Sequence, residues 1–297
     1  MTPAELQKKY SSTVEEHFEN EHYPRYLYKY RKLEEHTKDI IIYNGMYFCS
    51  PVDSNDPFDF RLPINLGESI RKLRKENFVF YLNNLKKDLE NNNKEILEEI
   101  SEDELLKIRK KLNSKDVKSI AEELLKTAPY LEDIIQKIRR ETGICCFSKK
   151  CDNVLMWSHY AQDHKGICFK FDIKEDSNFF SPLITVEYKK EVDLNISEYF
   201  LNYNKFSKDI ARVKHSDWSY EKEVRVIKTG FKDSDRKKRF LKFKPDALKE
   251  IIFGFKTDPE VILDYMNLCK NHNKNIIFFK MNSAENGRFE LEKIPIK

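Results

Sequence analysis

The chain has few glycines. Only 7 of its 297 residues are glycine, and neither of the two common glycine-rich phosphate-binding loops is present. This excludes the nucleotide-binding folds that depend on such a loop. A Gly-x-Ser-x-Gly segment is also missing, which excludes the hydrolases that place a nucleophilic serine on that turn.

Long apolar runs are missing as well. Apolar runs such as those at 39–43 and 275–279 have the length of a β-strand, whereas a membrane-spanning helix needs about 20 predominantly apolar residues. The N-terminus carries no apolar signal segment. We therefore expect a soluble cytoplasmic protein that makes no contact with a membrane.

The chain has no strong excess of one charge. Lys and Arg number 54 and Asp and Glu number 50, which gives a net charge of +4, although charged residues make up 35% of the chain. Because the charges are mixed rather than clustered, this balance permits binding of a nucleotide or nucleic acid but does not argue for it.

The six cysteines are expected to be reduced thiols, because the chain is large and lacks a leader. Cys146, Cys151, His159 and His164 could be combined into a zinc site, but they lack the paired short spacing of a zinc knuckle. Cys146, His159 and Asp172 could be drawn as a thiol-protease triad, which nothing in their spacing favours. We predict no metal site.

Helix-like and strand-like segments do not alternate strictly, which favours an α+β fold with a mixed, largely antiparallel sheet. Between residues 67 and 141 the composition changes: Lys and Glu dominate, and Leu and Ile recur at helical spacing. We predict an all-helical insertion at 67–141 within a core formed by 1–66 and 142–297. The insertion would be a lid or a surface for a protein partner, and its charged runs are most simply solvated faces.

Capping residues, apolar periodicity and glycine or proline stops give the expected elements. The expected helices are 2–20, 33–43, 155–161, 197–213 and 258–272, and the expected strands are 25–31, 46–50, 143–148, 167–172, 183–188, 239–244, 250–254, 275–280 and 288–293.

The segment 215–228 stands out. From Tyr220 it is typical of a β-strand, and alternation would place Glu221, Glu223 and Arg225 on one face. One interpretation is an edge strand whose charged face is solvated and forms salt bridges. The other is a catalytic strand, on which a neighbouring guanidinium keeps a carboxylate ionised.

Three groups of residues combine aromatic side chains with charged or polar ones near strand ends. They are Tyr28, Lys29, Tyr30 and Arg31; Ser148, Trp157, His159 and Tyr160; and Glu221, Glu223 and Arg225. Aromatic rings together with Arg or Lys suit a ligand with flat rings and phosphates, which describes a nucleotide. The alternatives are that Trp157 and Tyr160 belong to the core and that His159 is a structural histidine.

Several blocks of sequence resemble the signature of a large bacterial family of unknown function. These are Asn55-Asp-Pro-Phe-Asp59, 157–160 followed by 164–166, and 218–225. Members of that family typically begin with a Leu-Tyr-Lys-Tyr-Arg segment, which is found here at 27–31. The resemblance covers most of the chain outside 67–141, and it brings no settled activity.

A second resemblance suggests a reaction. The Glu-x-Glu at 221–223 and the order of the blocks are similar to those of ADP-ribosyltransferases, most of all the DarT-type toxins. The resemblance implies that Glu223 hydrogen-bonds the ribose next to nicotinamide and stabilises the transition state, with Glu221 in support. It also implies that Lys29 or Arg31 holds the pyrophosphate of NAD, and that Tyr28 or Tyr30 stacks on nicotinamide.

Taken together, these resemblances imply an enzyme that uses NAD as a substrate and transfers ADP-ribose to a nucleic acid or a protein, in a toxin or anti-phage setting. Ser148, Trp157, His159, Tyr160 and Arg225 would complete the NAD site. The alternative is a non-catalytic protein of bacterial defence that binds or senses a nucleotide or nucleic acid. A third hypothesis is an interaction module that acts through residues 67–141.

Overall fold

The computed structural model describes residues 23–60, 136, 139–191, 210–231, 236–273, 275–284 and 288–296. The chain divides into two compact units. The first comprises Met1–Asn55, Arg139–Tyr188 and Lys214–Lys297, and the second comprises Asp56–Ile138 and Lys189–Val213. The expected helix at 2–20 and nearly all of the expected insertion at 67–141 lie outside the described residues, so both stay predictions.

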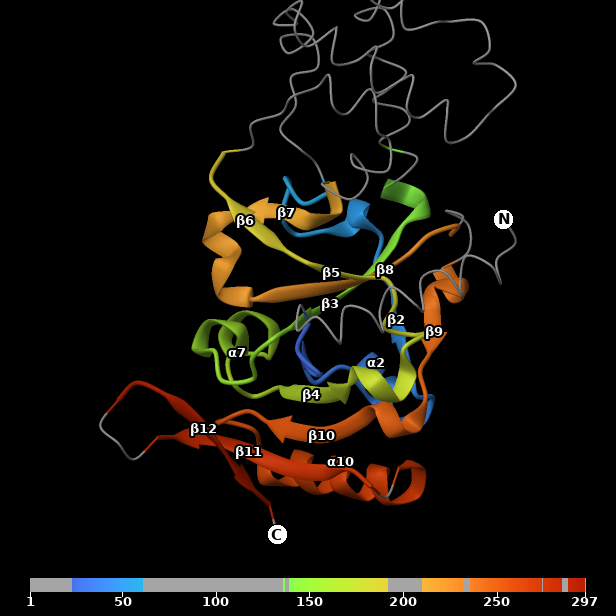
Figure 1. Cartoon of the computed structure of the whole chain (residues 1–297). Helices are drawn as coiled ribbons and strands as arrows, with labels where there is room; N and C mark the ends of the chain where they lie inside the picture. The colour runs from blue at the N-terminus through green and yellow to red at the C-terminus, as the bar shows by residue number, and fades with distance from the viewer. Residues whose placement is uncertain are drawn as a thin grey trace, which may run out of the picture. The chain divides into compact units, whose positions relative to one another are not determined.

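An eight-stranded sheet forms the centre of the first unit, in the order β12-β11-β10-β4-β1-β3-β8-β5 (Figure 1). Its strands are β1 (Tyr26–Arg31), β3 (Gly143–Ser148), β4 (Ile167–Asp172), β5 (Leu183–Thr185), β8 (Glu223–Lys228), β10 (Leu248–Phe253), β11 (Ile277–Ser283) and β12 (Leu291–Pro295). Neighbouring strands are antiparallel except β10 and β11, which are parallel. The predicted α+β class with a mixed, mostly antiparallel sheet is confirmed.

Two short sheets accompany the large one: β2 (Gly45–Tyr47) pairs with β9 (Phe240–Lys242), and β6 (Glu187–Lys189) pairs with β7 (Val213–His215). The expected strand at 183–188 is thus divided. The interruption is Val186, which belongs to neither strand, although its N–H still donates to the carbonyl of Glu223 in β8 at 3.1 Å.

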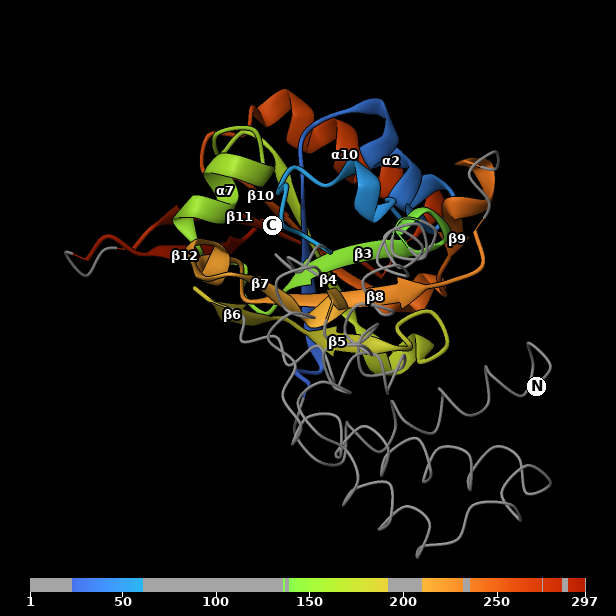
Figure 2. The same ribbon diagram turned by 90° about the horizontal axis from the view of Figure 1, so that it is seen from above.

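Helices cover both faces of the large sheet. One face packs against α2 (Glu35–Ile42) and α10 (Pro259–His272), which lie side by side in Figure 2, and the other against α7 (Val154–Tyr160). Successive residues of a strand enter opposite cores, as Ile251 and Ile252 do. The α7 side is the smaller core, and it contains the fully buried Trp157.

Local capping explains where α7 and α10 begin. Asp258 accepts a hydrogen bond from the N–H of Glu260, with Pro259 in the first turn, so α10 starts where the sequence predicts. Asn153 accepts from two N–H groups at the start of α7, and its amide donates to the carbonyl of Tyr220 at 3.0 Å. One asparagine therefore both starts α7 and attaches it to the segment that leads into β8.

The predicted strand from Tyr220 is wrong at its start. Residues Ser216–Glu221 form a 3₁₀-helix, η4, and β8 begins only at Glu223. Lys222 between them has φ 46° and ψ 49°, in the left-handed region, so the strict alternation that would carry Glu221 onto the strand is broken. Nor is β8 an edge strand, because it lies between β3 and β5. The prediction of a solvated edge strand is therefore also wrong.

None of the described helices combines the length and the apolar character needed to cross a membrane. All six cysteines are free. Across the part of the chain that the structure describes, no three His, Cys, Asp or Glu side chains are grouped so that they could hold a metal ion.

The loop after α7 has an unusual backbone. Gln162, Asp163 and His164 have φ of 51°, 52° and 69°, and the left-handed region costs a non-glycine residue about 1–2 kcal/mol. Neighbouring segments hold this turn: the carbonyl of His164 accepts from the N–H of Lys256 at 2.9 Å. A Cβ at Gly254 would lie only 2.1 Å from that same carbonyl oxygen, so the close approach requires glycine.

We therefore expect Gly254→Ala to lower the free energy of unfolding by about 3 kcal/mol, because the atom in the way is backbone and cannot rotate aside. Gly230→Ala is the matched control, since Gly230 has φ +87° but nothing within 4 Å of a new Cβ, and it should cost about 1 kcal/mol. Urea unfolding of both variants measures the difference. Equal losses would show that Gly254 is not under this steric constraint.

Candidate functional site

The strand register brings several predicted site residues to one face of the sheet. Tyr28 lies opposite Ser148 in the pairing of β1 with β3, and Ser148 lies opposite Glu223 in the pairing of β3 with β8. Residues directly opposite one another in a sheet share a face. This is the face that α7 covers, and Arg225, two residues after Glu223, lies on it as well.

Lys29 and Arg31 alternate with Tyr28 and Tyr30 and therefore lie on the opposite face. The ammonium of Lys29 donates to the carbonyl of Cys146 at 2.7 Å and lies 5.6 Å from the ring centroid of Phe147, which belongs to the other core. The two cations predicted to hold pyrophosphate are thus separated by the sheet from the predicted catalytic glutamates.

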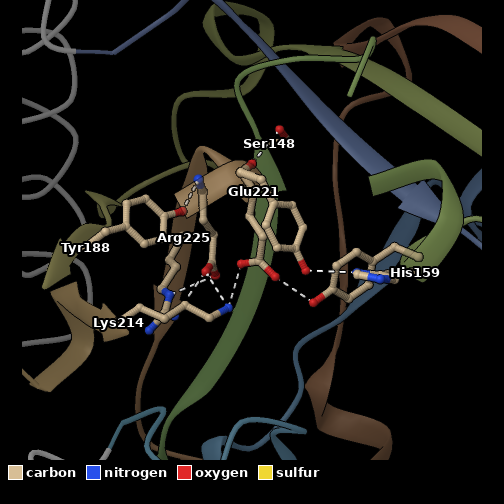
Figure 3. A network of polar contacts seen from close by, with 9 residues as sticks. Ser148, His159, Tyr188, Lys214, Glu221 and Arg225 are labelled. Atoms are coloured by element: carbon tan, nitrogen blue, oxygen red, sulfur yellow. Dashed lines mark hydrogen bonds and ion pairs between the residues drawn. The ribbon is translucent and has the colours of Figure 1, made fainter. Parts of the chain in front are cut away.

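Four charged side chains form the centre of the site (Figure 3). The ammonium of Lys214 lies 2.6 Å from Oε2 of Glu221 and 3.1 Å from Oε2 of Glu223. Arg225 donates from Nε to Oε1 of Glu223 at 2.8 Å and from Nη2 to Oε2 at 3.1 Å. The two cations balance the two anions, which is the condition for burying charges. Relative exposures of 7%, 4%, 3% and 0% for Lys214, Glu221, Glu223 and Arg225 show that they are buried.

Uncharged hydroxyl groups also form hydrogen bonds with the two glutamates. The hydroxyl of Tyr160 on α7 donates to Oε1 of Glu221 at 2.6 Å. Ser148 donates its hydroxyl to the main-chain carbonyl of Glu221 at 2.7 Å, and the hydroxyl of Tyr188 accepts from the N–H of Glu223 at 2.8 Å. Ser148 therefore acts on the backbone at the end of η4, whereas Tyr160 contacts the carboxylate itself.

The surroundings shift the pKa values of the two carboxyl groups in opposite directions. Burial raises the pKa of Glu221, partly offset by the Lys214 ammonium and reinforced by the Glu223 carboxylate. Burial also acts to raise the pKa of Glu223, but the charges of Arg225 and Lys214 outweigh it and hold that pKa below its usual range. Two chemically identical groups thus acquire different protonation behaviour.

These shifts have opposite consequences for stability. The lowered pKa of Glu223 contributes stability above the ordinary glutamate pKa of about 4.3, and that contribution is lost as the pH falls towards the folded-state value. The raised pKa of Glu221 contributes stability at low pH, which is lost as the pH rises through the folded-state value.

Aromatic side chains border the charged centre. Nδ1 of His159, an exposed residue, lies 2.9 Å from the hydroxyl of Tyr220, and the two rings are 5.7 Å apart. The ring centroids of Trp218 and Tyr220 are 6.2 Å apart, and the ammonium of Lys214 lies 5.0 Å from the Trp218 ring centroid. We call His159, Tyr160, Trp218 and Tyr220 the aromatic rim; apart from the exposed His159, its members are half-buried.

Trp157 and Tyr30, which were predicted to contact a ligand, lie in the core beneath α7. Their rings meet edge to face at 5.2 Å. The indole N–H of Trp157 donates to the carbonyl of Cys151, and the Tyr30 hydroxyl to that of Lys150. Their polar atoms are therefore occupied, and both residues support the helix that carries His159 and Tyr160. Tyr28 is half-buried beside the same core.

Sequence reasoning missed Lys214, although it is the cation that both glutamates share. It lies in β7, directly after a segment that we predicted to be helical. The available signal was indirect: two glutamates two residues apart cannot both be buried beside a single arginine without a further cation. Asn55, the first residue of the Asn55–Asp59 block, hydrogen-bonds with Tyr160 and thereby acts against the burial and the Glu221 charge that raise the tyrosine's pKa.

A protein-family model described as "Protein of unknown function (DUF2971)" matches residues 156–226. The matched segment runs from α7 into β8, and it contains the aromatic rim and all four buried charged residues. The match supports the resemblance to a domain-of-unknown-function family. No curated protein and no solved structure matches the chain.

Removing Lys214 should destabilise the fold, because it leaves two buried carboxylates facing one another. We expect Lys214→Met to lower the free energy of unfolding at neutral pH by about 3–5 kcal/mol. The double variant with Glu221→Gln should recover part of this loss, since Arg225 then balances Glu223 alone. Urea unfolding near neutral pH measures all three proteins.

Lys170→Met is the control, because Lys170 also pairs with a buried glutamate, at 2.7 Å from Glu250, but outside this site. Glu250 keeps a second partner in Lys293, so this loss should be smaller. A Lys214→Met protein as stable as the control, or one that Glu221→Gln destabilises further, would contradict the charge-balance explanation.

Proposed function

We propose that this protein is an ADP-ribosyltransferase-like enzyme that consumes NAD as a substrate and transfers ADP-ribose to a macromolecule. The observation that carries the proposal is the carboxylate of Glu221. It is held between Tyr160 at 2.6 Å and the Lys214 ammonium at 2.6 Å, it has a raised pKa, and it adjoins the aromatic rim.

The reaction needs a carboxylate at this kind of position. The bond between nicotinamide and C1 of the ribose breaks, nicotinamide leaves with the electron pair, and positive charge develops on the ribose. A fixed carboxylate stabilises that charge. As the acceptor forms its bond to C1, its proton must leave, and a carboxylate with a raised pKa is suited to take it.

The contacts favour Glu221 over Glu223 for this role. Both oxygens of Glu223 accept hydrogen bonds from Arg225, and one also contacts Lys214. Glu221 instead connects through Tyr160 to α7, which also carries the exposed His159. The resemblance to ADP-ribosyltransferases gave the principal role to Glu223. We assign it to Glu221, and propose that Glu223 positions Lys214.

The half-buried rings of the aromatic rim favour a substrate with flat rings, as nicotinamide and adenine are. The acceptor class, nucleic acid or protein, and a cytoplasmic toxin or anti-phage role rest on the sequence resemblance and form part of the proposal.

A second candidate function has a specific observation in its favour. Both glutamates are buried and neutralised by Lys214 and Arg225, as expected of ion pairs that stabilise a binding protein without taking part in chemistry. In that case the rim would bind a nucleotide or nucleic acid, and no bond would break. Turnover distinguishes the two functions.

We expect the purified protein to release nicotinamide from NAD, with water as the acceptor of ADP-ribose when no DNA, RNA or protein is added. Glu221→Gln should reduce the rate about a hundredfold or more, because an amide cannot stabilise positive charge as a carboxylate does. Glu223→Gln should also reduce it, through the displacement of Lys214. Chromatographic quantification of nicotinamide measures all of these rates.

Glu250→Gln is the matched control, since Glu250 is a buried glutamate held by Lys170 and Lys293 on the same sheet. It should release nicotinamide at the wild-type rate. If the folded wild-type protein releases none under any condition, the enzyme proposal is wrong and the binding function is favoured. Full activity in Glu221→Gln would refute the role of that residue.

A further inference from the structure

Two lysines are neighbours next to the charged centre. Lys149 directly follows β3, and Lys222 directly precedes β8. The N–H of Lys149 donates to the carbonyl of Lys222 at 3.0 Å, which joins the two segments at this point. Lys149 is half-buried and Lys222 is exposed. Lys149 thus follows Ser148 directly in the sequence, and Lys222 lies between Glu221 at the end of η4 and Glu223 at the start of β8.

Among the residues that the structure describes, no acid pairs with these two positive charges. Within the part of the chain that the structure describes, neither ammonium group has a hydrogen-bond or ion-pair partner. Burial lowers the pKa of Lys149, and the charge of Lys222 lowers it further, with no carboxylate acting in the other direction. Lys170 and Lys214, by contrast, each have a carboxylate partner, and Lys29 and Lys228 donate to main-chain carbonyls.

The backbone at Lys222 is strained. Its φ of 46° and ψ of 49° lie in the left-handed region, which glycine adopts readily and which strains a lysine. Strained non-glycine residues are concentrated at functional sites. Here the strained residue separates the two site glutamates, and its side chain is exposed while theirs are buried.

We propose that Lys149 and Lys222 form the subsite that binds the phosphate groups of the substrate. A pyrophosphate anion would relieve the repulsion between two like charges, and lysine is a common phosphate ligand in proteins. The identity of the substrate as NAD rests on the proposed function, whereas the anion chemistry does not.

Inorganic pyrophosphate is the probe, titrated into the full-length protein by calorimetry. We expect Lys149→Gln and Lys222→Gln each to weaken binding about tenfold, the loss of one charge-assisted contact. Lys256→Gln, which removes an exposed lysine at the far end of β10, should leave the affinity unchanged. Absence of pyrophosphate binding to the wild type, or equal affinity in all four proteins, would overturn the proposal.

Lys222→Gly separates binding from folding. It relieves the left-handed strain, so its melting temperature should rise, and it removes the ammonium, so pyrophosphate affinity should fall as in Lys222→Gln. If Lys222 had only a structural role, the melting temperature would rise without a fall in pyrophosphate affinity. Unchanged affinity in this more stable variant would refute the subsite.

Nicotinamide release keeps this proposal distinct from the proposed function. If the wild type releases nicotinamide and Lys149→Gln and Lys222→Gln have the wild-type KM for NAD, the subsite proposal is wrong although the enzyme proposal stands. If pyrophosphate binding depends on both lysines but no nicotinamide is released, the subsite stands and the enzyme proposal fails.

Discussion

A single ammonium group, that of Lys214, contacts two buried carboxylates, and the local structure depends on this shared contact. Glu221 and Glu223 would repel one another in a medium of low polarity without it. Arg225 occupies both oxygens of Glu223, which leaves Lys214 as the main cation for Glu221. The unequal share of positive charge separates the pKa values of two glutamates that are only two residues apart.

This inequality gives the two residues different roles in our proposal. Glu223 positions Arg225 and Lys214. Glu221 is the group whose protonation can change when a ligand binds or the pH changes. Tyr160 connects Glu221 to α7, and Asn153 connects the start of the same helix to η4. The segment matched by the family model contains all of these contacts except that of Asn153.

Much of the fold could be predicted from the sequence. The strands at 143–148 and 167–172 and the helix that starts after Asp258 were placed correctly, because apolar periodicity and capping are local signals. The site was predicted only in part. Alternation cannot reveal that Lys222 takes a left-handed conformation or that its carbonyl accepts a hydrogen bond from Lys149. Lys214 could not be found from any motif, because its pairing with Glu221 and Glu223 is a tertiary contact between η4, β7 and β8.

The central claim is that Lys214 and Arg225 separate the behaviour of the two glutamates, and carboxyl-carbon NMR titration tests it most directly. With Glu221→Gln and Glu223→Gln used for assignment, Glu223 should titrate below the ordinary glutamate pKa of about 4.3 and Glu221 above it. Lys214→Met should move the Glu221 titration to still higher pH. If both carboxyl groups titrate together near the ordinary value, the buried charge network described above does not exist in solution.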